Sequence, residues 1–296
     1  PFAGSVLALG ELDDALGRGA IAEDDMLGES TVGAMRRALA EGEAVGAIAW
    51  SRRADAVTAG AGGRASGAPW QLTGRPDPVV DGPVADVLVV LGRDAEGPAL
   101  FATATEAASR APGEPAMDRT RAMSWTTFAD APALRLGGGE SVEALVDRGA
   151  TLVCAEMLGA AARVLDMTVE YAKDRVQFDR PIGSFQAVKH RCADMLVDVE
   201  GMRSTTYYAA WAVGADDAEA RAAASAAKIW CSDASARVMG SGLQVHGGIG
   251  FTWEHDLHLY LKRAQLDRVR FGDATFHRER LAAILRPKAE KGEPVL

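Results

Sequence analysis

The stretch VKHRCADMLVDVEGMRSTTYYAAWAV, residues 188–213, decides the fold of the C-terminal half of this chain. Its apolar and small residues recur at alternating steps of four and three along the sequence. The residues at these steps are Val188, Cys192, Met195, Val199, Met202, Thr206, Ala209 and Val213. A seam that repeats about every 3.5 residues is typical of helices packed at about 20° in an antiparallel bundle. The stretch is therefore predicted to form one long bundle helix.

The sequence on both sides of this stretch predicts the other helices of the bundle. The same spacing precedes it at Leu158, Ala162, Leu165, Val169 and Ala172. An alanine-rich helix is predicted from about 217 to 241, and a fourth helical region from about 254 to 285, interrupted near Phe271-Gly272. Pro181 is the only proline between residues 140 and 286, so long helices are allowed throughout this half. We therefore predict a four-helix bundle.

Residues 44–138 have a different pattern, which predicts a β-rich region. Short apolar runs such as AVGAIAW, ADVLVVLG and GPALFAT alternate with clusters of glycine and proline. Runs of four to eight apolar residues bounded by turn formers are typical of strands. Asp81-Gly82 is a candidate turn between two of these strands. A run of glycines, Gly137–Gly139, then closes this half of the chain.

The predicted fold is multidomain α and β, with a C-terminal four-helix bundle, a smaller middle β-domain and a truncated helical part at the N-terminus. The predicted boundaries are 1–43, 44–138, 139–287 for the bundle and 288–296 for a tail. Within the first part, residues 31–42 are predicted to form a helix capped by Ser30 or Thr31. The chain opens inside an apolar stretch, as though helices upstream of it were absent.

The composition excludes several functional classes. The 296 residues carry 32 Lys and Arg against 41 Asp and Glu, a formal net charge of −9, which argues against non-specific nucleic-acid binding. No apolar run reaches the roughly 18–20 residues of a membrane span, and the first residues lack the basic segment of a signal peptide. Cys154, Cys192 and Cys231 have no metal-ligand spacing and are predicted to be small buried hydrophobes. We therefore expect a cytoplasmic protein without a metal site.

The first stretch that could carry chemistry is YAKDRVQFDRPIGSFQ, residues 171–186. It predicts a helix that ends near Arg175, where a cation is stabilised by the helix macrodipole and a guanidinium can bind a phosphate with two hydrogen bonds. Phe178 offers an aromatic face to a planar ring. The structural alternative is that Arg175 pairs with a neighbouring carboxylate and Phe178 fills the bundle.

The second stretch is QVHGGIGF, residues 244–251. Its three glycines can end a helix and let backbone N–H groups approach a ligand closely. A helix C-cap followed by a tight turn is the structural alternative for the same glycines.

Together, within a four-helix bundle, these stretches resemble the acyl-CoA dehydrogenase family, over residues 143–285 and more loosely over 44–138. The resemblance implies a flavoprotein whose FAD lies across a subunit interface. One subunit holds the flavin ring with its β-domain, and the bundle of its neighbour holds the adenosine and pyrophosphate. The residues that match the family's adenosine side are Arg175, Gln177, Phe178 and Gln186. The residues that match its pyrophosphate loop are Gln244, Gly247 and Gly248.

The chain departs from this family at the catalytic base. The family's reaction removes a proton from the α-carbon of an acyl-CoA thioester while a hydride moves to the flavin, and it needs a carboxylate base. The two positions at which the family places this glutamate correspond to Phe271 and Gly149, and neither residue can accept a proton. Asp273 and Asp147 each lie two positions away, as candidates for a displaced base or for surface and capping roles. No catalytic residue is therefore predicted.

The flavin side of the resemblance is also incomplete. Residues 49–55, AWSRRAD, stand where the family has a Thr-Glu-Pro-x-Ala-Gly-Ser-Asp-like segment, and residues 78–80, PVV, stand where a Trp-Ile-Thr/Ser strand backs the flavin. One half of the binding chemistry is thus present and the other half is missing. This combination resembles the smaller, base-less subunit of the heterotetrameric acyl-CoA dehydrogenases that actinobacteria use in steroid degradation.

The narrower resemblance implies an acyl-CoA substrate, a second acyl-CoA dehydrogenase-like subunit in an α2β2 heterotetramer, and electron-transfer flavoprotein as the acceptor. The alternatives are a self-sufficient homomeric enzyme with a displaced base and a scaffold that has lost FAD. Apolar residues off the helix seams predict a second buried surface between chains, unless the β-half and the missing N-terminal helices cover them. These residues are Val153, Met157, Val164, Met167, Leu196, Val197 and Trp211.

Overall fold

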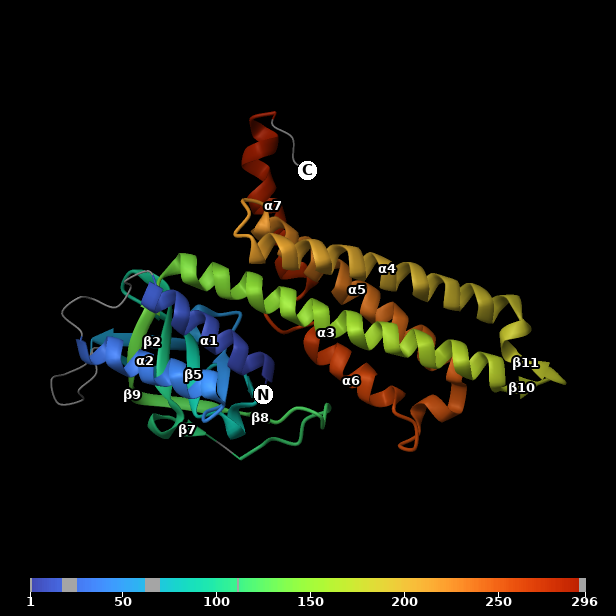
Figure 1. Cartoon of the computed structure of the whole chain (residues 1–296), viewed down its shortest axis with the longest axis horizontal. Coiled ribbons are helices and arrows are strands. Elements are labelled where there is room, and N and C mark those ends of the chain that lie inside the picture. The colour runs from blue at the N-terminus through green and yellow to red at the C-terminus, as the bar shows by residue number, and fades with distance from the viewer. Residues whose placement is uncertain (1, 18–25, 62–69, 111, 293–296) are drawn as a thin grey trace. The chain divides into compact units, whose positions relative to one another are not determined.

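Figure 1 shows the chain as a computed structural model, which describes residues 2–17, 26–61, 70–110 and 112–292. The chain divides into two compact units, residues 1–146 and 147–296. The boundary between them falls within one long helix, α3 (Gly139–Asp174).

The first unit begins with two helices, α1 (Phe2–Gly17) and α2 (Met26–Glu41), which pack against each other. The apolar side chains of Leu7 and Leu12 on α1 are buried, and α1 also packs against the strands that follow. The helix predicted at 31–42 is present but begins earlier, at Met26. Ser30 and Thr31 therefore lie inside α2 and do not cap it.

The rest of the first unit is a small closed sheet. Its strands are β1 (Gly46–Ala49), β2 (Val57–Ala61), β3 (Trp70–Gly74), β5 (Val87–Asp94), β6 (Gly97–Ala104), β7 (Ser109–Arg110) and β9 (Thr126–Gly137). They follow the order β1-β5-β2-β3-β9-β6, with β7 at the end of β9, and β6 pairs back onto β5 along its whole length, which closes the sheet into a barrel. Phe101, Phe128 and Leu72 fill its interior. The three apolar runs singled out in the sequence form β1, β5 and β6.

Asp81-Gly82 forms a turn, as predicted, but it does not join a hairpin. Asp81 has a left-handed backbone, with a φ of 61°. The strand before it, β4 (Val79–Val80), pairs with β8 (Met123–Ser124), whereas β5 after it pairs with β1 and β6. The turn therefore sends the chain from one small sheet to another.

The second unit holds the long helices α4 (Gln186–Gly214) and α5 (Ala220–His246), which pack side by side along with the rest of α3 (Figure 1). The predicted seam on α4 is confirmed over its centre, where Met195, Val199, Met202, Thr206 and Ala209 are buried. Small residues permit the close approach, since a Cβ at Gly201 of α4 would lie 2.5 Å from the Trp230 ring of α5. The alanine-rich helix runs from 220 to 246 rather than from 217 to 241.

The last part of the chain forms α6 (Leu257–Asp267) and α7 (Ala274–Glu290), and both pack against α5. The predicted interruption near Phe271-Gly272 is the connection between them, residues 268–273.

The apolar residues predicted to lie off the helix seams differ in burial, and Met167 of α3 is half-buried. Val153, Met157 and Val164 of α3 are buried within the chain, so the prediction that they form an outer surface is wrong. Their neighbours include α5, because the Ser235 hydroxyl lies 3.6 Å from the Met157 sulfur. The residues of α4 on this surface are exposed in the chain: Leu196, Val197 and Trp211.

Cys154 and Cys231 are buried as predicted, Cys192 is half-buried, and all three are free thiols. Within the residues that the structure describes, no group of three or more His, Cys, Asp or Glu side chains is placed to hold a metal ion. A search of the same residues for a helix with the length and apolarity of a bilayer span finds none.

Candidate functional site

A short hairpin joins α3 to α4, at one end of the helical unit (Figure 1). Its strands are β10 (Val176–Gln177) and β11 (Arg180–Pro181). The two residues between them, Phe178 and Asp179, have φ angles of 55° and 59°, as in a type I′ turn. A bulky residue in this left-handed region is strained, and such strain gathers at functional sites. The Phe178 side chain is not packed into the bundle, since 85% of its surface is exposed.

The polar residues of this hairpin end are also open to solvent. The Arg175 backbone holds the hairpin, because its N–H donates to the Tyr171 carbonyl at 2.9 Å and its carbonyl accepts from Ile182 at 2.8 Å. The guanidinium of Arg175 is exposed, and it forms no ion pair in the described part of the chain. The amides of Gln177 and Gln186 are exposed as well. The structural alternative for this stretch, an ion-paired Arg175 and a Phe178 inside the bundle, is therefore wrong.

The glycine-rich stretch forms the turn between α5 and α6. Helix α5 ends at His246, and the Gly247 N–H then donates to the Leu243 carbonyl, which caps the helix. Gly247 has a φ of 61°, so a residue with a side chain would be strained there. A Cβ at Gly247 or Gly248 would meet no atom within 4 Å. The loop is thus both a C-cap and an open stretch of backbone that a ligand can approach closely, and Gln244 is exposed one turn before it.

The structure brings these two stretches together through an aromatic contact. The rings of Tyr171, on the last turns of α3, and His246, at the end of α5, stack at 4.6 Å with an angle of 19° between them. His246 also lies edge-on to His255, which precedes α6, at 4.7 Å. Sequence analysis did not single out these three residues. The available signal was that Tyr171 lies one helical turn before Arg175 and His246 directly before Gly247.

The two positions predicted to have lost a catalytic base, Phe271 and Gly149, lie against each other. Phe271 is buried, with a φ of 52°, in the connection between α6 and α7. A Cβ at Gly149, on α3, would lie 2.5 Å from the Phe271 ring. The phenyl ring therefore fills the space that a carboxylate from either position would need.

Both candidates for a displaced base have structural roles in this region. Asp147 is buried and forms ion pairs with Arg280 at 2.5 Å and with Arg221 at 3.9 Å. The Asp273 carboxylate accepts a hydrogen bond from the Phe276 N–H at 2.8 Å and caps the N-terminus of α7. Each carboxylate is thus engaged in a structural contact, Asp147 with two guanidiniums and Asp273 with a helix end.

Buried polar groups fix the connection that carries Phe271. The ammonium of Lys228, on α5, is fully buried and donates to the carbonyls of Asp267 at 2.9 Å and Arg268 at 3.0 Å. The His277 Nε2 donates to the Phe271 carbonyl at 2.9 Å. Burial lowers the pKa of Lys228 to about 8 and that of His277 to about 4, and it raises the pKa of Asp267 to about 7. These groups were not predicted, because nothing in their spacing sets them apart.

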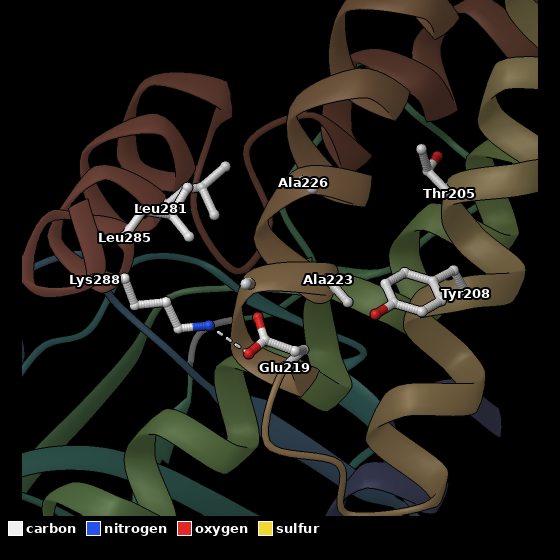
Figure 2. Close-up of a pocket in the computed structure, with 9 residues that line it drawn as sticks. Thr205, Tyr208, Glu219, Ala223, Ala226, Leu281, Leu285 and Lys288 are labelled. Atoms are coloured by element: carbon white, nitrogen blue, oxygen red, sulfur yellow. Dashed lines mark hydrogen bonds and ion pairs between the residues drawn. The ribbon is translucent and has the colours of Figure 1, made fainter. Parts of the chain in front are cut away.

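A separate cavity of about 520 Å³ lies between α4, α5 and α7 (Figure 2). Its floor is apolar, formed by the three alanines Ala222, Ala223 and Ala226 with Leu281 and Leu285. Tyr208, Glu219 and Lys288 also line it, and the dashed line in Figure 2 marks the ion pair between Glu219 and Lys288. The size suits a small ligand, but the cavity contains none of the predicted site residues and no group suited to acid–base chemistry beyond that ion pair.

In the first unit, the residues at the family's flavin-side positions serve the barrel. The buried hydroxyl of Ser51 accepts a hydrogen bond from the Asp77 N–H at 2.6 Å. Val79 is buried in the core of the unit. These side chains are therefore used within their own unit.

The helical bundle, the hairpin and the glycine loop together are the features on which the sequence resembles the acyl-CoA dehydrogenases. The comparison with protein families gives the same class. The model of the acyl-CoA dehydrogenase C-terminal domain matches residues 120–285. This chain belongs to the acyl-CoA dehydrogenase family.

Among curated proteins, the chain is 39% identical over 189 residues to acyl-CoA dehydrogenase IpdE2 of Mycolicibacterium smegmatis, covering 64% of this chain and 55% of that protein. It is 40% identical over 215 residues to IpdE2 of Mycobacterium tuberculosis, covering 71% of this chain and 60% of that one. The chain thus spans less than two thirds of the length of these relatives.

Two solved structures have the same fold. A chain of the ChsE4–ChsE5 complex from Mycobacterium tuberculosis matches with a TM-score of 0.76 and 31% identity, over 86% of this chain and 69% of that one. A chain of a Tcur3481–Tcur3483 steroid acyl-CoA dehydrogenase variant matches with a TM-score of 0.83 and 26% identity, over 98% of this chain and 77% of that one.

Proposed function

We propose that this chain is one subunit of an FAD-dependent acyl-CoA dehydrogenase that introduces an α,β double bond into an acyl-CoA thioester. It supplies the adenosine and pyrophosphate half of the FAD site, and a partner chain supplies the catalytic base. The observation that carries this proposal is the contact between Phe271 and Gly149, which leaves no space for a base at either family position. The open hairpin and glycine loop at the other end of the same helices supply the binding half.

The residues present fit the phosphate-bearing end of FAD. Arg175 offers an exposed guanidinium for two charge-assisted hydrogen bonds to a phosphate, and Phe178 offers an exposed ring face for the adenine. A Cβ at Gly247 or Gly248 would meet no atom within 4 Å, so a pyrophosphate can approach the loop there, although the Gly247 N–H is already used in the helix cap. FAD, when bound, supplies the acceptor for the hydride that leaves the β-carbon of the acyl chain.

A partner of the same family is part of this proposal. Leu196, Val197 and Trp211 of α4 are 50%, 67% and 58% exposed. A group of exposed apolar side chains is typical of a surface that a partner chain covers. The ChsE4–ChsE5 neighbour is a complex of two different chains, and the Tcur3481–Tcur3483 neighbour is described as a steroid acyl-CoA dehydrogenase. These similarities support an α2β2 heterotetramer that acts on a steroid-derived acyl-CoA and passes electrons to electron-transfer flavoprotein.

The two alternative functions have less support. A self-sufficient enzyme would need Asp147 or Asp273 as its base, and both carboxylates are held in structural contacts. A scaffold without FAD would have no use for an exposed Arg175 or for a strained Phe178 turned toward solvent.

Co-expression with the product of a neighbouring gene tests the proposal. We expect a defined complex with one FAD for each pair of chains and with activity on acyl-CoA in the presence of an artificial electron acceptor. The chain alone should be less active by ~10²–10⁴-fold or more, which is the usual contribution of a general base. Steady-state dehydrogenation by the single purified chain would overturn the proposal.

A further inference from the structure

The two stretches of the proposed cofactor half-site lie far apart in the sequence, and nothing in their own backbones ties one to the other. The hairpin stands on the end of α3 through the hydrogen bond from the Arg175 N–H to the Tyr171 carbonyl. The glycine loop stands on the end of α5 through the Gly247 cap. A ligand that bridges them needs the two helix ends held in a fixed relation.

The ring stack of Tyr171, His246 and His255 supplies such a link, because it joins α3, α5 and the segment before α6. Its central ring is the most constrained of the three. His246 is buried, and its Nδ1 lies 2.8 Å from the Gly242 carbonyl oxygen, which can only accept a hydrogen bond. The proton therefore resides on Nδ1. Nε2 is buried and has no hydrogen-bond partner in the described part of the chain.

The surroundings of His246 keep its ring neutral and in place. The titratable groups that face it are the Tyr171 phenol and the His255 imidazole, and neither is a carboxylate. The His255 Nδ1 is itself engaged, as it accepts a hydrogen bond from the Leu257 N–H at 3.1 Å. Burial lowers the pKa of His246, and the neighbouring His255 lowers it further.

The glycine loop turns back onto the base of the His246 side chain. A Cβ at Gly250 would lie 3.2 Å from the Cβ of His246, so the loop backbone is in contact with the base of the His246 side chain. On the other side, a Cβ at Gly183 would lie 2.8 Å from the Ala172 carbonyl, so the segment after the hairpin packs on the residue next to Tyr171. The loop thus contacts the residue that carries one ring of the stack, and the segment after the hairpin contacts the residue that follows the other in the chain.

We propose that Tyr171 and His246 are positioning residues, whose stacked rings hold the Arg175 hairpin and the Gly247–Phe251 loop at the separation that one bridging cofactor needs. This inference rests on the proposed FAD half-site. Neither side chain is assigned a contact with the cofactor. Their effect is transmitted through the helix ends that they join.

The test compares three variants of the full chain, each purified in its complex. Tyr171→Leu removes the flat ring and keeps apolar volume, whereas Tyr171→Phe keeps the ring. Tyr260→Leu is the control, because it makes the same change at a half-buried tyrosine on α6 that lies outside the stack. The measurements are the Kd for FAD, hydrogen exchange of peptides covering 175–180 and 247–251, and the Tm.

Tyr171→Leu is expected to raise the Kd for FAD about three- to tenfold, the range of one aromatic stacking contact. It should also speed hydrogen exchange in both peptides together. Tyr171→Phe should behave as the wild type. Tyr260→Leu should change only the Tm. A Tyr171→Leu variant that lowers the Tm but leaves the Kd and both exchange rates unchanged would overturn the inference, as would failure of Tyr171→Phe to restore them.

Failure of the underlying function gives a different result. If Arg175→Ala and Tyr171→Leu both leave the Kd for FAD unchanged, the proposed half-site is wrong. Hydrogen exchange in the Tyr171→Leu variant then tests separately whether the stack links the two loops. Faster exchange in both peptides supports such a link, and unchanged exchange refutes it.

Discussion

The two ends of the helical unit use their space in opposite ways. At the end where α3 turns into α4 and α5 into α6, the Phe178 side chain is 85% exposed, and a Cβ at Gly247 or Gly248 would meet no atom within 4 Å. At the other end, around Phe271, the interior is filled so tightly that Gly149 has no room for a methyl group. The same helices therefore carry an open surface, the proposed half-site, at one end and an ordinary packed core at the other.

In the proposed function, this difference accounts for a chain that lacks a catalytic base and keeps its fold. A carboxylate at the Phe271 position would be buried beside Gly149 and would need charged or hydrogen-bonding partners. The phenyl ring replaces it with apolar packing that needs none. Polar groups around it, such as the Lys228 ammonium and the His277 imidazole, hold the backbone of the connection.

The largest expected effects concern the packed end. Phe271→Ala should cost about 3–5 kcal/mol of unfolding free energy, because it leaves a cavity in the core. Gly149→Ala should cost about 1–3 kcal/mol in the wild type, because the new methyl group overlaps the Phe271 ring. In the Phe271→Ala background the same methyl group has space, so Gly149→Ala should cost almost nothing there. Denaturant unfolding of the two single variants and the double variant measures this coupling.

Gly159 provides the matched control for this cycle. It lies on the same helix, and a Cβ there would meet no atom within 4 Å. Gly159→Ala should therefore stabilise the chain by up to about 1 kcal/mol, as alanine does in an open helix position. Additive effects of Gly149→Ala and Phe271→Ala would contradict the contact on which the proposed loss of the base depends.

The packed end should also make stability depend on pH. His277 has a pKa lowered to about 4 by burial, with Lys228 and Arg280 acting in the same direction. The unfolded chain binds a proton at this residue near pH 6.5, whereas the folded chain resists protonation until about pH 4. The contribution of His277 to the free energy of unfolding should therefore be greatest above pH 6.5. It should fall by on the order of 3 kcal/mol as the pH drops from 6.5 to below 4.

His277→Gln isolates this residue from the other titrating groups. The glutamine amide can still donate to the Phe271 carbonyl, but it cannot take up a proton. The free energy of unfolding, measured from pH 7 to pH 4, should fall less steeply with decreasing pH for the variant than for the wild type. Equal slopes for the two proteins would show that His277 does not resist protonation in the fold.

Sequence patterns predicted the packed helices better than the contacts between them. The seam from Met195 to Ala209 was predictable because a period of three and four is a local property of one helix. Val153 and Met157 were assigned to an outer surface because a period does not tell how many neighbours cover a helix, and here α3 buries a wide face.

The candidate site shows the same division. The residues of the hairpin and the glycine loop were proposed from short motifs, and most of them are exposed in the structure, but their role in binding stays a prediction. Alignment to the family placed Phe271 and Gly149 separately, but only the fold brings the ring onto the glycine. The stack of Tyr171 on His246 joins segments whose spacing in the sequence carries no signal, so it could not be predicted.

The open end should respond through ligand binding rather than through stability. Arg175→Ala should weaken FAD retention in the assembled complex by about 1.5–3 kcal/mol, the contribution of charge-assisted hydrogen bonds to a phosphate. The Tm should change little, because the guanidinium is exposed. Arg163→Ala, at another exposed arginine of α3, is the matched control and should leave both quantities unchanged. Flavin content after gel filtration measures the effect. Equal flavin content in the wild type and both variants would show that Arg175 does not bind FAD.

The smallest expected effect separates a capping role of Asp273 from a catalytic one. The Asp273 carboxylate accepts from the Phe276 N–H at the start of α7, and replacement of such a cap by alanine typically costs about 1 kcal/mol. Asn caps helices nearly as well as Asp, so Asp273→Asn should keep the stability that Asp273→Ala loses. Activity of the complex should be the same for Asp273→Asn as for the wild type, because an amide removes any proton acceptor but keeps the cap. If Asp273→Asn keeps the wild-type Tm but abolishes dehydrogenation, Asp273 is the base, and the helical unit carries catalysis at its packed end after all.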